Sequence, residues 1–523
     1  MANEKKPSDD VKRGGLNDEQ VEELEREGKI IVVHFEDGDE ENPMNWPKSK
    51  KWITTILLCA MTLFIGLATS AYSVGISSMC EEFGVDSEVG QVGMFVFNAA
   101  FSVVPLFFAP LSETIGRNPV YLVNYALFTV FFIPLALGKN IWTIIIARFF
   151  SGIFGAAGTT LIGGGLSDIW VTSERSAPMA LFSFAAVLGT ILAPLYSGYI
   201  LLYKGWRWIQ WVQLIVNGVV CLIEFAFCRE TRGAVILTKR AKKLRKDTGD
   251  ERYRSPVELE RDSYKDVLKD SCTKAVKLLV HEPTVIFFSF YLAFSWSMIF
   301  LFFTVIPLTF EGNHGWKTGN SGLAYLGLVV GTCLGYATNF WQDHLYDKAT
   351  AANGGVARPE ARLYGMMAGA VIFPIGMWIF SWTQFGYVHW IAPIIALVPM
   401  VFGIYHIFVA TYSYLTDAYG ENGSSAVAGQ GFIRNLMAAS LPLFGGYMFK
   451  GMTYQGAGSF LAGLATLAAP FPFLLYKYGP TIREKSKFAS TMDKKNKNQT
   501  EKKQQQKGRR SESTLDESSA SEA

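Results

Sequence analysis

Long apolar runs separated by short polar stretches dominate the sequence. Each run is long enough, at a helical rise of 1.5 Å per residue, to cross a hydrocarbon core of about 30 Å. A bilayer core offers the backbone no water, so each run must satisfy its own hydrogen bonds as a helix. Buried helices of a large soluble enzyme would explain one or two such runs, whereas we expect about twelve. The predicted spans are 52–74, 91–111, 119–138, 141–166, 177–203, 207–228, 284–310, 320–341, 361–383, 387–414, 423–449 and 456–478.

Polar segments divide these runs into two sets of six. Residues 1–51 form a polar, acidic segment that we expect to be disordered, apart from a short helix in NDEQVEELERE. Residues 229–283 form a central loop that contains KRAKKLRKDTGDERYR, and residues 479–523 form a low-complexity tail with no expected structure. The predicted domains between them are two six-helix bundles, residues 52–228 and 284–478.

The charges are segregated, so the net charge of +3 says little about partners. KSKK precedes the first span, and the central loop and the tail are rich in Lys and Arg. In contrast, the segment after the first span, CEEFGVDSEVG, contains acidic residues but no Lys or Arg. The positive-inside rule then predicts that both termini and the central loop are cytoplasmic, in agreement with an even number of spans. The polar start, MANEKKPSDD, predicts that the first span is its own signal anchor rather than a cleaved peptide.

Several classes of function find no support in the sequence. The six cysteines show no disulfide pattern, and we interpret them as free, small apolar residues. There is no GxxxxGK[ST] motif, no metal-ligand cluster and no nucleophile with a partner base, so we expect no ATP-driven pump, no enzyme, no cofactor, no metal and no nucleic-acid partner. Two sets of six spans suit a secondary transporter, whose site lies between the bundles near the membrane midplane.

A polar hairpin, APLSETIGRNPVY (109–121), lies between the second and third runs. It resembles the loop signature of the major facilitator superfamily, G-x-L-x-D-R-x-G-R-R. Leu111, Gly116 and Arg117 match, Glu113 stands for Asp, and Ala109, Thr114 and Asn118 replace a glycine and two arginines. The resemblance implies a gating latch in which Glu113 docks near the start of the eleventh span and Arg117 meets Asp168, the acid that ends the fourth. A merely solvated turn is the alternative.

The fourth and fifth spans carry two further resemblances to this superfamily. Arg148, followed by Gly152, Gly155 and Gly158, resembles the R-x-x-x-G-x-x-G pattern in which the arginine is linked to proton transfer; alternatively, Arg148 extends outward to the membrane surface.

AVLGTILAPLYSGYI in the fifth span resembles the antiporter signature G-x-x-x-G-P-x-x-G-G. Gly189, Pro194 and Gly198 match it, with Ala193 and Ser197 in place of glycines. In the superfamily this signature accompanies export by proton exchange, although any bent membrane helix can contain Gly and Pro.

Other segments resemble the fungal twelve-span drug:proton antiporters over roughly residues 41 to 486. They are ENPMNWPKSKKW, KRAKKLRKDTG, ARPEARL, SYLTDAYG, FIRNLMAASLPLFGGYMF and YKYGPTIREKS. Within ARPEARL and SYLTDAYG, Glu360, Arg362 and Asp417 are candidates for a latch in the second bundle, with ordinary interfacial charge as the alternative.

Candidates for the substrate cavity are polar or aromatic residues within spans, each of which can also serve packing: Asn98, Gln213, Asn217, Tyr291, Trp296 and Asn339. Arg148 and Arg434 are deep cations, and no carboxylate is expected near the middle of a span. This charge pattern favours a neutral or anionic substrate. His406, Glu224 and Asp168 are the titratable candidates for proton coupling.

These observations predict an all-α integral membrane protein with the major facilitator fold. We expect a monomer that exports small organic molecules from the cell through the plasma membrane of a fungus, in exchange for protons. An importer or uniporter on the same fold is the first alternative. A non-transporting membrane sensor is the second, although a sensor has no need of an alternating-access latch.

Overall fold

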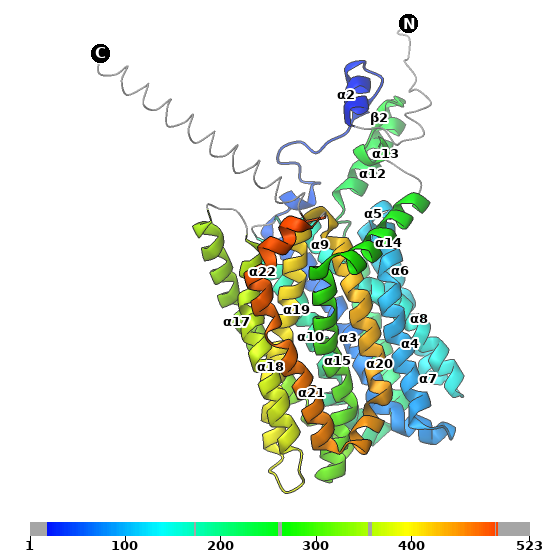
Figure 1. Ribbon diagram of the computed structural model, residues 1–523. Helices are drawn as coiled ribbons and strands as arrows, with labels where there is room; N and C mark the ends of the chain where they lie inside the picture. The colour runs from blue at the N-terminus through cyan, green and yellow to red at the C-terminus, as the bar shows by residue number, and fades with distance from the viewer. Residues whose placement is uncertain (1–17, 172–173, 260–263, 354–357, 487, 490–523) are drawn as a thin grey trace.

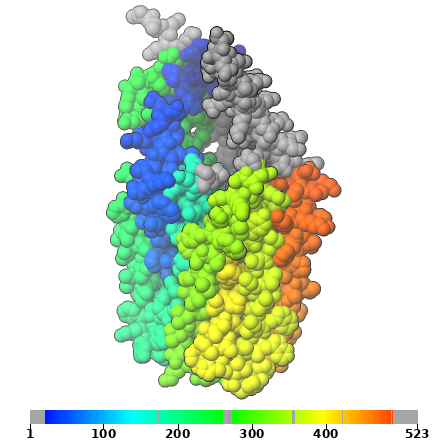
Figure 2. Space-filling view, turned by 90° about the vertical axis from the view of Figure 1, so that its left-hand side faces the viewer, coloured from blue at the N-terminus to red at the C-terminus, as the bar shows by residue number. Residues whose placement is uncertain are grey.

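The computed structural model describes residues 18–171, 174–259, 264–353, 358–486 and 488–489. The helices run roughly parallel in an elongated body, and both described chain ends lie at one side, which we call the terminal face (Figure 1). The opposite side is the far face. The two halves of the chain occupy separate regions that lie side by side (Figure 2).

The first bundle is built from nine helical segments, several of which are parts of one span. They are α3 (Lys48–Phe83), α4 (Ser87–Val103), α5 (Pro105–Ile115), α6 (Arg117–Val130), α7 (Phe132–Leu137), α8 (Ile141–Thr160), α9 (Ile162–Ile169), α10 (Ser176–Lys204) and α11 (Trp206–Phe227). Pro105 follows the break between α4 and α5, which are bent by 47°. Gly84, in the left-handed conformation, ends α3.

The second bundle repeats this plan in the second half of the chain. Its segments are α15 (Pro283–Pro307), η2 (Leu308–Asn313), α16 (Thr318–Leu323), α17 (Leu326–Ala352), η3 (Pro359–Arg362), α18 (Leu363–Thr383), α19 (Ile391–Tyr419), η4 (Gly420–Asn422), α20 (Gly423–Gly451), α21 (Tyr454–Ala468) and α22 (Phe471–Lys485).

The predicted count of twelve spans is not confirmed. Within the described residues, ten helices are long and apolar enough to cross a membrane, or eleven if bent α4 and α5 form one span. The helix outside this set is α20, at the position of the predicted span 423–449. Its sequence contains Gln430, Arg434, Asn435 and Lys450, which lower its hydropathy. Two of them, Arg434 and Asn435, line a cavity between the two bundles.

A small folded unit projects from the terminal face (Figure 1); we call it the clasp (residues 18–46 and 229–259). It contains α2 (Asp18–Arg26), β1 (Ile31–Val32), η1 (Pro43–Asn45), α12 (Gly233–Thr248), β2 (Tyr253–Arg254) and α13 (Pro256–Leu259). β1 and β2 pair in parallel, with Ile31 opposite Tyr253. In the chain that follows, α14 (Tyr264–His281) packs against α5 and α20.

The clasp differs from the disorder expected for residues 1–51. α2 lies within the short helix expected there, but the residues after it are also ordered. Their apolar side chains pack against residues of the central loop. Ile30 and Leu259 are buried together, and Val33 packs with Leu237. Residues 1–17 and 490–523, which include most of the predicted tail, lie outside the described residues.

Candidate functional site

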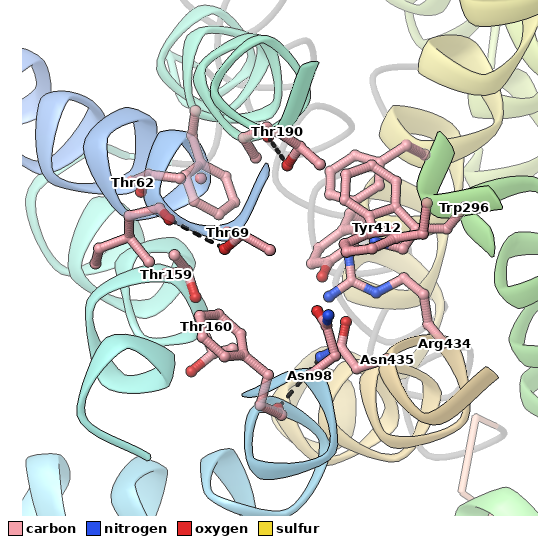
Figure 3. Close-up of a pocket in the computed structure, with 17 residues that line it drawn as sticks. Thr62, Thr69, Asn98, Thr159, Thr160, Thr190, Trp296, Tyr412, Arg434 and Asn435 are labelled. Atoms are coloured by element: carbon pink, nitrogen blue, oxygen red, sulfur yellow. Dashed lines mark hydrogen bonds between the residues drawn. The ribbon is translucent and has the colours of Figure 1, made fainter. Parts of the chain in front are cut away.

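A cavity of about 70 Å³ lies between the two bundles, at the middle of α3 and near the end of α4 (Figure 3). Its walls differ in chemistry. The first bundle contributes mostly hydroxyls and small groups, and the second contributes aromatic rings and one cation. The residues that line the cavity include Thr62, Thr69, Asn98, Thr159, Thr160, Thr190, Trp296, Phe300, Phe408, Tyr412, Arg434 and Asn435.

Arg434 on α20 is the charged residue among those that line this central cavity. Its side chain is 7% exposed, and its guanidinium carbon lies 5.1 Å from the ring centre of Trp296 and 5.4 Å from that of Phe408. Its Nε atom has no hydrogen-bond partner. A buried cation that contacts rings but no acid keeps part of its donor capacity for another molecule.

The polar groups of the opposite wall are already bonded to their own helices. Thr62, Thr69 and Thr190 donate to backbone oxygens four residues earlier, at 3.2, 3.1 and 2.8 Å. Asn98 donates to the Met94 oxygen, whereas Asn435 donates across the bundle interface to the Phe101 oxygen at 3.2 Å. Asn435 therefore links α20 to α4 beside the cavity.

A second cavity, of about 260 Å³, adjoins the central cavity toward the terminal face. The two share the lining residues Thr159, Thr160, Phe182, Tyr412, Arg434 and Asn435. A third cavity, of about 590 Å³, opens toward the far face and shares no lining residue with either.

The terminal-face and far-face cavities carry opposite charge. The charged residues that line the first are Glu113, Arg117, Arg175 and Arg434. Those that line the second are Glu81, Glu88, Glu311 and Lys450. The terminal-face cavity is thus lined mainly by arginines among its charged residues, and the far-face cavity mainly by glutamates.

Arg117 lies at the start of α6, on the terminal face, and joins several groups of the first bundle. Its Nε atom is 3.1 Å from Asp168 Oδ2, and its Nη1 atom donates to Ser112 Oγ at 2.6 Å. Its Nη2 atom lies 3.7 Å from Glu113. The structure thus brings Arg117 and Asp168 together. Glu113 lines the terminal-face cavity near Gly423 at the start of α20, and its described ion pair is with Arg117.

Glu230, which follows α11, completes this cluster and was not identified from the sequence. Its Oε1 atom accepts hydrogen bonds from the backbone N–H of Arg117 at 2.9 Å and of Arg232 at 2.9 Å, and its Oε2 atom accepts from Asn118 at 3.3 Å. Gly116 has φ of 117°, and a Cβ there would collide with the Glu230 carboxylate. An acid directly after a span, in ETRG, was the available signal.

A similar cluster lies on the terminal face of the second bundle. Arg362 Nε is 2.8 Å from Asp417 Oδ2, and the guanidinium lies over the ring of Tyr346 at 3.4 Å. Asp343 lies 3.8 Å from Arg362 and accepts a hydrogen bond from Ser176 of the first bundle at 2.6 Å. Glu360 is separate from this cluster and pairs with Arg483 at 3.2 Å.

Arg148 is fully buried inside the first bundle and does not extend to the surface. It donates to the backbone oxygens of Gly93 and Ala68, both at 3.3 Å, and its guanidinium lies 4.1 Å from the ring centre of Phe97. A Cβ at Gly152 would lie 2.5 Å from the Phe97 oxygen, so α8 approaches α4 closely here.

The titratable candidates lie away from the central cavity. Glu224 is 1% exposed inside the first bundle, and its Oε1 atom has no hydrogen-bond partner. His406 Nε2 is 2.9 Å from Thr338 Oγ1, in the second bundle. His406 and Asn339 line a small space of about 10 Å³ next to Asp343 and Arg362.

The other predicted cavity residues divide into two groups. Asn98 and Trp296 line the central cavity. Gln213 and Asn217 instead bond within the first bundle, to Tyr196 and Tyr125, and Tyr291 packs near Phe471. Their helical positions turn these three side chains toward their own bundle rather than toward the interface.

The glycines and proline predicted on the fifth span mark close approaches of α10 to its neighbours. A Cβ at Gly189 would meet the backbone of Leu63 on α3, and one at Gly198 would lie 2.9 Å from the Thr318 oxygen. The Pro194 oxygen lies 2.5 Å from where a Cβ on Gly322 would be. α10 therefore packs tightly within its bundle and against α16 of the other.

No group of three or more His, Cys, Asp or Glu side chains that could hold a metal is found in the described part of the chain. All six cysteines are free, as predicted.

Comparisons with known proteins agree with this architecture. A family model described as Major Facilitator Superfamily matches residues 58–440. A major facilitator superfamily multidrug transporter of Aspergillus fumigatus is 36% identical over 463 residues, which cover 88% of this chain and 76% of that protein. The efflux pump FUB11 of Gibberella moniliformis is 34% identical over 460 residues, covering 88% and 77%.

Solved structures show the same fold at low sequence identity. A POT family transporter in complex with 5-aminolevulinic acid superposes with a TM-score of 0.58 and 11% identity, over 84% of this chain and 97% of that one. The human organic anion transporter MFSD10 gives a TM-score of 0.51 and 16% identity, over 82% and 100%. The chain is therefore a multi-span membrane transporter that belongs to the major facilitator superfamily.

Proposed function

We propose that this chain exports small organic molecules in exchange for protons, by alternating access through the central cavity. The observation that carries the proposal is this cavity itself, which lies between the bundles and adjoins a second cavity toward the terminal face. Relatives of this chain are named as multidrug transporters and efflux pumps, which supports export as the direction of transport.

The proposed orientation places the terminal face in the cytoplasm, as the charge pattern predicts. The basic helix α12 and Lys48, Lys50 and Lys51 lie at this face, whereas Glu81, Glu82 and Glu88 lie at the far face. Lys and Arg are enriched on the cytoplasmic side of membrane proteins. With this orientation, substrate enters through the arginine-lined cavity from the cytoplasm.

Alternating access needs contacts between bundles that open on one side and close on the other. On the terminal side, the bond from Ser176 to Asp343 joins the bundles, and beside the central cavity Asn435 bonds to the Phe101 oxygen. On the far side, α10 packs on α16, where Tyr199 and Asn320 are 3.3 Å apart. Release to the far side requires α10 and α16 to separate while the terminal contacts tighten.

The charged clusters of the terminal face serve as latches in this proposal. Arg117 with Asp168, and Arg362 with Asp417, fix the ends of the spans in each bundle. Asp343 joins the second cluster to Ser176, so bundle rotation and latch geometry are connected.

Proton coupling requires a group that gains and loses a proton as access alternates. Glu224 and His406 are the proposed carriers, and Arg148 is proposed to position the neighbouring helices through its backbone contacts. Neutral or anionic compounds are the proposed substrates, because no acidic side chain lines the central cavity.

Purified protein in liposomes with an internal pH-sensitive dye tests this function. A panel of weak acids, neutral drugs and cations is added under an imposed proton gradient. Proton flux that needs both the protein and particular compounds is expected. Substrate movement without proton flux would favour a uniporter, and no movement by folded, correctly oriented protein would favour a sensor.

A further inference from the structure

The side chain of Arg434 points into the central cavity from α20, opposite the threonines of α3 and α8 (Figure 3). It is more than nine-tenths buried, and its Nε atom has no hydrogen-bond partner. A buried charge in a membrane protein is costly unless it is paired. A guanidinium presents a planar fork of N–H donors, which matches the geometry of a carboxylate.

Asn435 and Asn98 extend the donor set next to Arg434. Each amide nitrogen donates one hydrogen bond to a backbone oxygen, at 3.2 Å to Phe101 and 3.0 Å to Met94. An amide nitrogen carries two N–H groups, so each keeps one donor. An acid group in the cavity therefore meets donors from two bundles and no acidic neighbour.

Four aromatic rings form a row beside the guanidinium. The ring centres are 6.3 Å apart for Phe300 and Trp296, 5.0 Å for Trp296 and Phe408, and 4.7 Å for Phe408 and Tyr412. Such a row favours a flat, apolar ligand that stacks on a ring face or edge. Ring and cation together favour a planar anion.

The available space fits a compound of one or two rings. A cavity of about 150 Å³ holds one benzene ring. Arg434 lines both the central cavity of about 70 Å³ and the terminal-face cavity of about 260 Å³, which together offer space for a ligand of roughly twice that size.

We propose, on the basis of the exporter function above, that Arg434 binds the carboxylate of an aromatic organic acid whose ring lies against Trp296, Phe408 and Tyr412. The arginine-lined terminal-face cavity attracts this anion toward Arg434. Asn435 bonds across the bundle interface beside the same site, so the bound carboxylate contacts a group that responds to bundle rotation.

Three naphthalene compounds that differ in charge test this assignment: 2-naphthoate, 2-naphthamide and 2-naphthylmethylammonium. Binding to the purified full-length protein is measured in detergent, without a gradient, by isothermal titration calorimetry. We expect naphthoate to bind about 10- to 100-fold more tightly than naphthamide, because charge-assisted hydrogen bonds are the stronger ones. The ammonium compound is expected to bind most weakly.

Variants then locate the charge preference. Arg434→Gln is expected to remove the preference for naphthoate over naphthamide while the affinity for naphthamide changes less than about threefold. Arg434→Lys is expected to restore part of it. Arg207→Gln removes an arginine that pairs with Glu82 at the far face and should leave all three affinities unchanged.

Several results would overturn the assignment. They are equal binding of naphthoate and naphthamide, preference for the ammonium compound, absence of binding of all three, or an equal loss for both compounds in Arg434→Gln. If that variant does not fold, the comparison of compounds on the unmodified protein still decides. Anion-selective binding without transport in liposomes would contradict the exporter function alone, whereas transport of neutral compounds alone would contradict the assignment alone.

Discussion

Gly116 is a residue at which a single methyl group should have a large effect. Its φ of 117° is unfavourable for any other residue, and an added Cβ would meet the carboxylate of Glu230. We expect Gly116→Ala to lower the free energy of unfolding by about 2 kcal/mol or more and to slow transport. Thermal unfolding of purified protein measures the first effect.

Gly218 provides the control for Gly116. It lies within α11, and no atom lies within 4 Å of where its Cβ would be. Gly218→Ala is expected to be neutral or to stabilise the helix by about 0.5–1 kcal/mol. Equal effects of the two substitutions would contradict the role of Gly116 in the turn.

The two arginine clusters of the terminal face should respond differently to loss of charge. Arg117→Gln leaves Asp168 paired with Arg232 at 3.1 Å. Arg362→Gln leaves Asp417 and Asp343 without their shared cation. Unpairing a largely buried carboxylate costs on the order of 3 kcal/mol, so Arg362→Gln is expected to reduce thermal stability more than Arg117→Gln. The reverse order would contradict the described pairing.

At the scale of elements, the clasp connects the N-terminal segment to the central loop. Asp39 pairs with Arg240, and the backbone N–H of Glu41 and the guanidinium of Arg240 hold the pKa of Asp39 below its usual range. Asp39 is therefore charged throughout pH 5–8, above its usual pKa of about 3.9. Stability gained from a lowered pKa is present above this value and is lost only as pH falls through the lowered one.

Limited proteolysis tests the clasp. Resistance of residues 18–46 to cleavage should stay constant between pH 5 and 8, and Asp39→Asn should reduce it at every pH in this range. Ile30→Asp, which places a charge against Leu259, should expose the segment while the transmembrane helices unfold at an unchanged temperature. Resistance that changes steeply within pH 5–8 would contradict this account.

The helical elements follow from the sequence to different degrees. Apolar runs locate α3, α10 and α19 well, because a membrane helix must be long and apolar. α20 lies at its predicted position, but it is less apolar than the other spans. Its hydropathy is lowered by polar residues, some of which line the central cavity. β1 and β2 could not be predicted, since two residues of pairing leave no periodic signal and depend on a partner more than 200 residues away.

The site follows from the sequence only in part for a related reason. Charged residues inside spans, such as Arg434 and Arg148, can be recognised from the sequence alone. The sequence alone does not show on which face of a helix an amide side chain lies. The sequence therefore did not distinguish Gln213 and Asn217, which bond within a bundle, from Asn98, which lies at the cavity. Glu230 was missed because its partners are backbone N–H groups, which no side-chain motif encodes.

At the scale of the whole molecule, the opposite charges of the two large cavities predict direction-dependent affinity for anions. Glu81 and Glu88 are exposed at the far-face cavity. Replacing both by Gln should raise the apparent affinity for 2-naphthoate added at the far face by about threefold to tenfold, since local charge changes the concentration of a charged ligand. The affinity for 2-naphthamide should not change. An equal change for both compounds, measured in oriented liposomes, would contradict the electrostatic explanation.

In the proposed mechanism, transport of an organic molecule through the cavity at Arg434 is coupled to a flux of protons in the opposite direction. The most direct measurement follows internal pH in proteoliposomes while 2-naphthoate and other compounds are added under an imposed proton gradient. We expect proton flux that starts only when a transported compound is present and that is reduced in Arg434→Gln for anions. Compound movement with no proton flux from folded, oriented protein would contradict it.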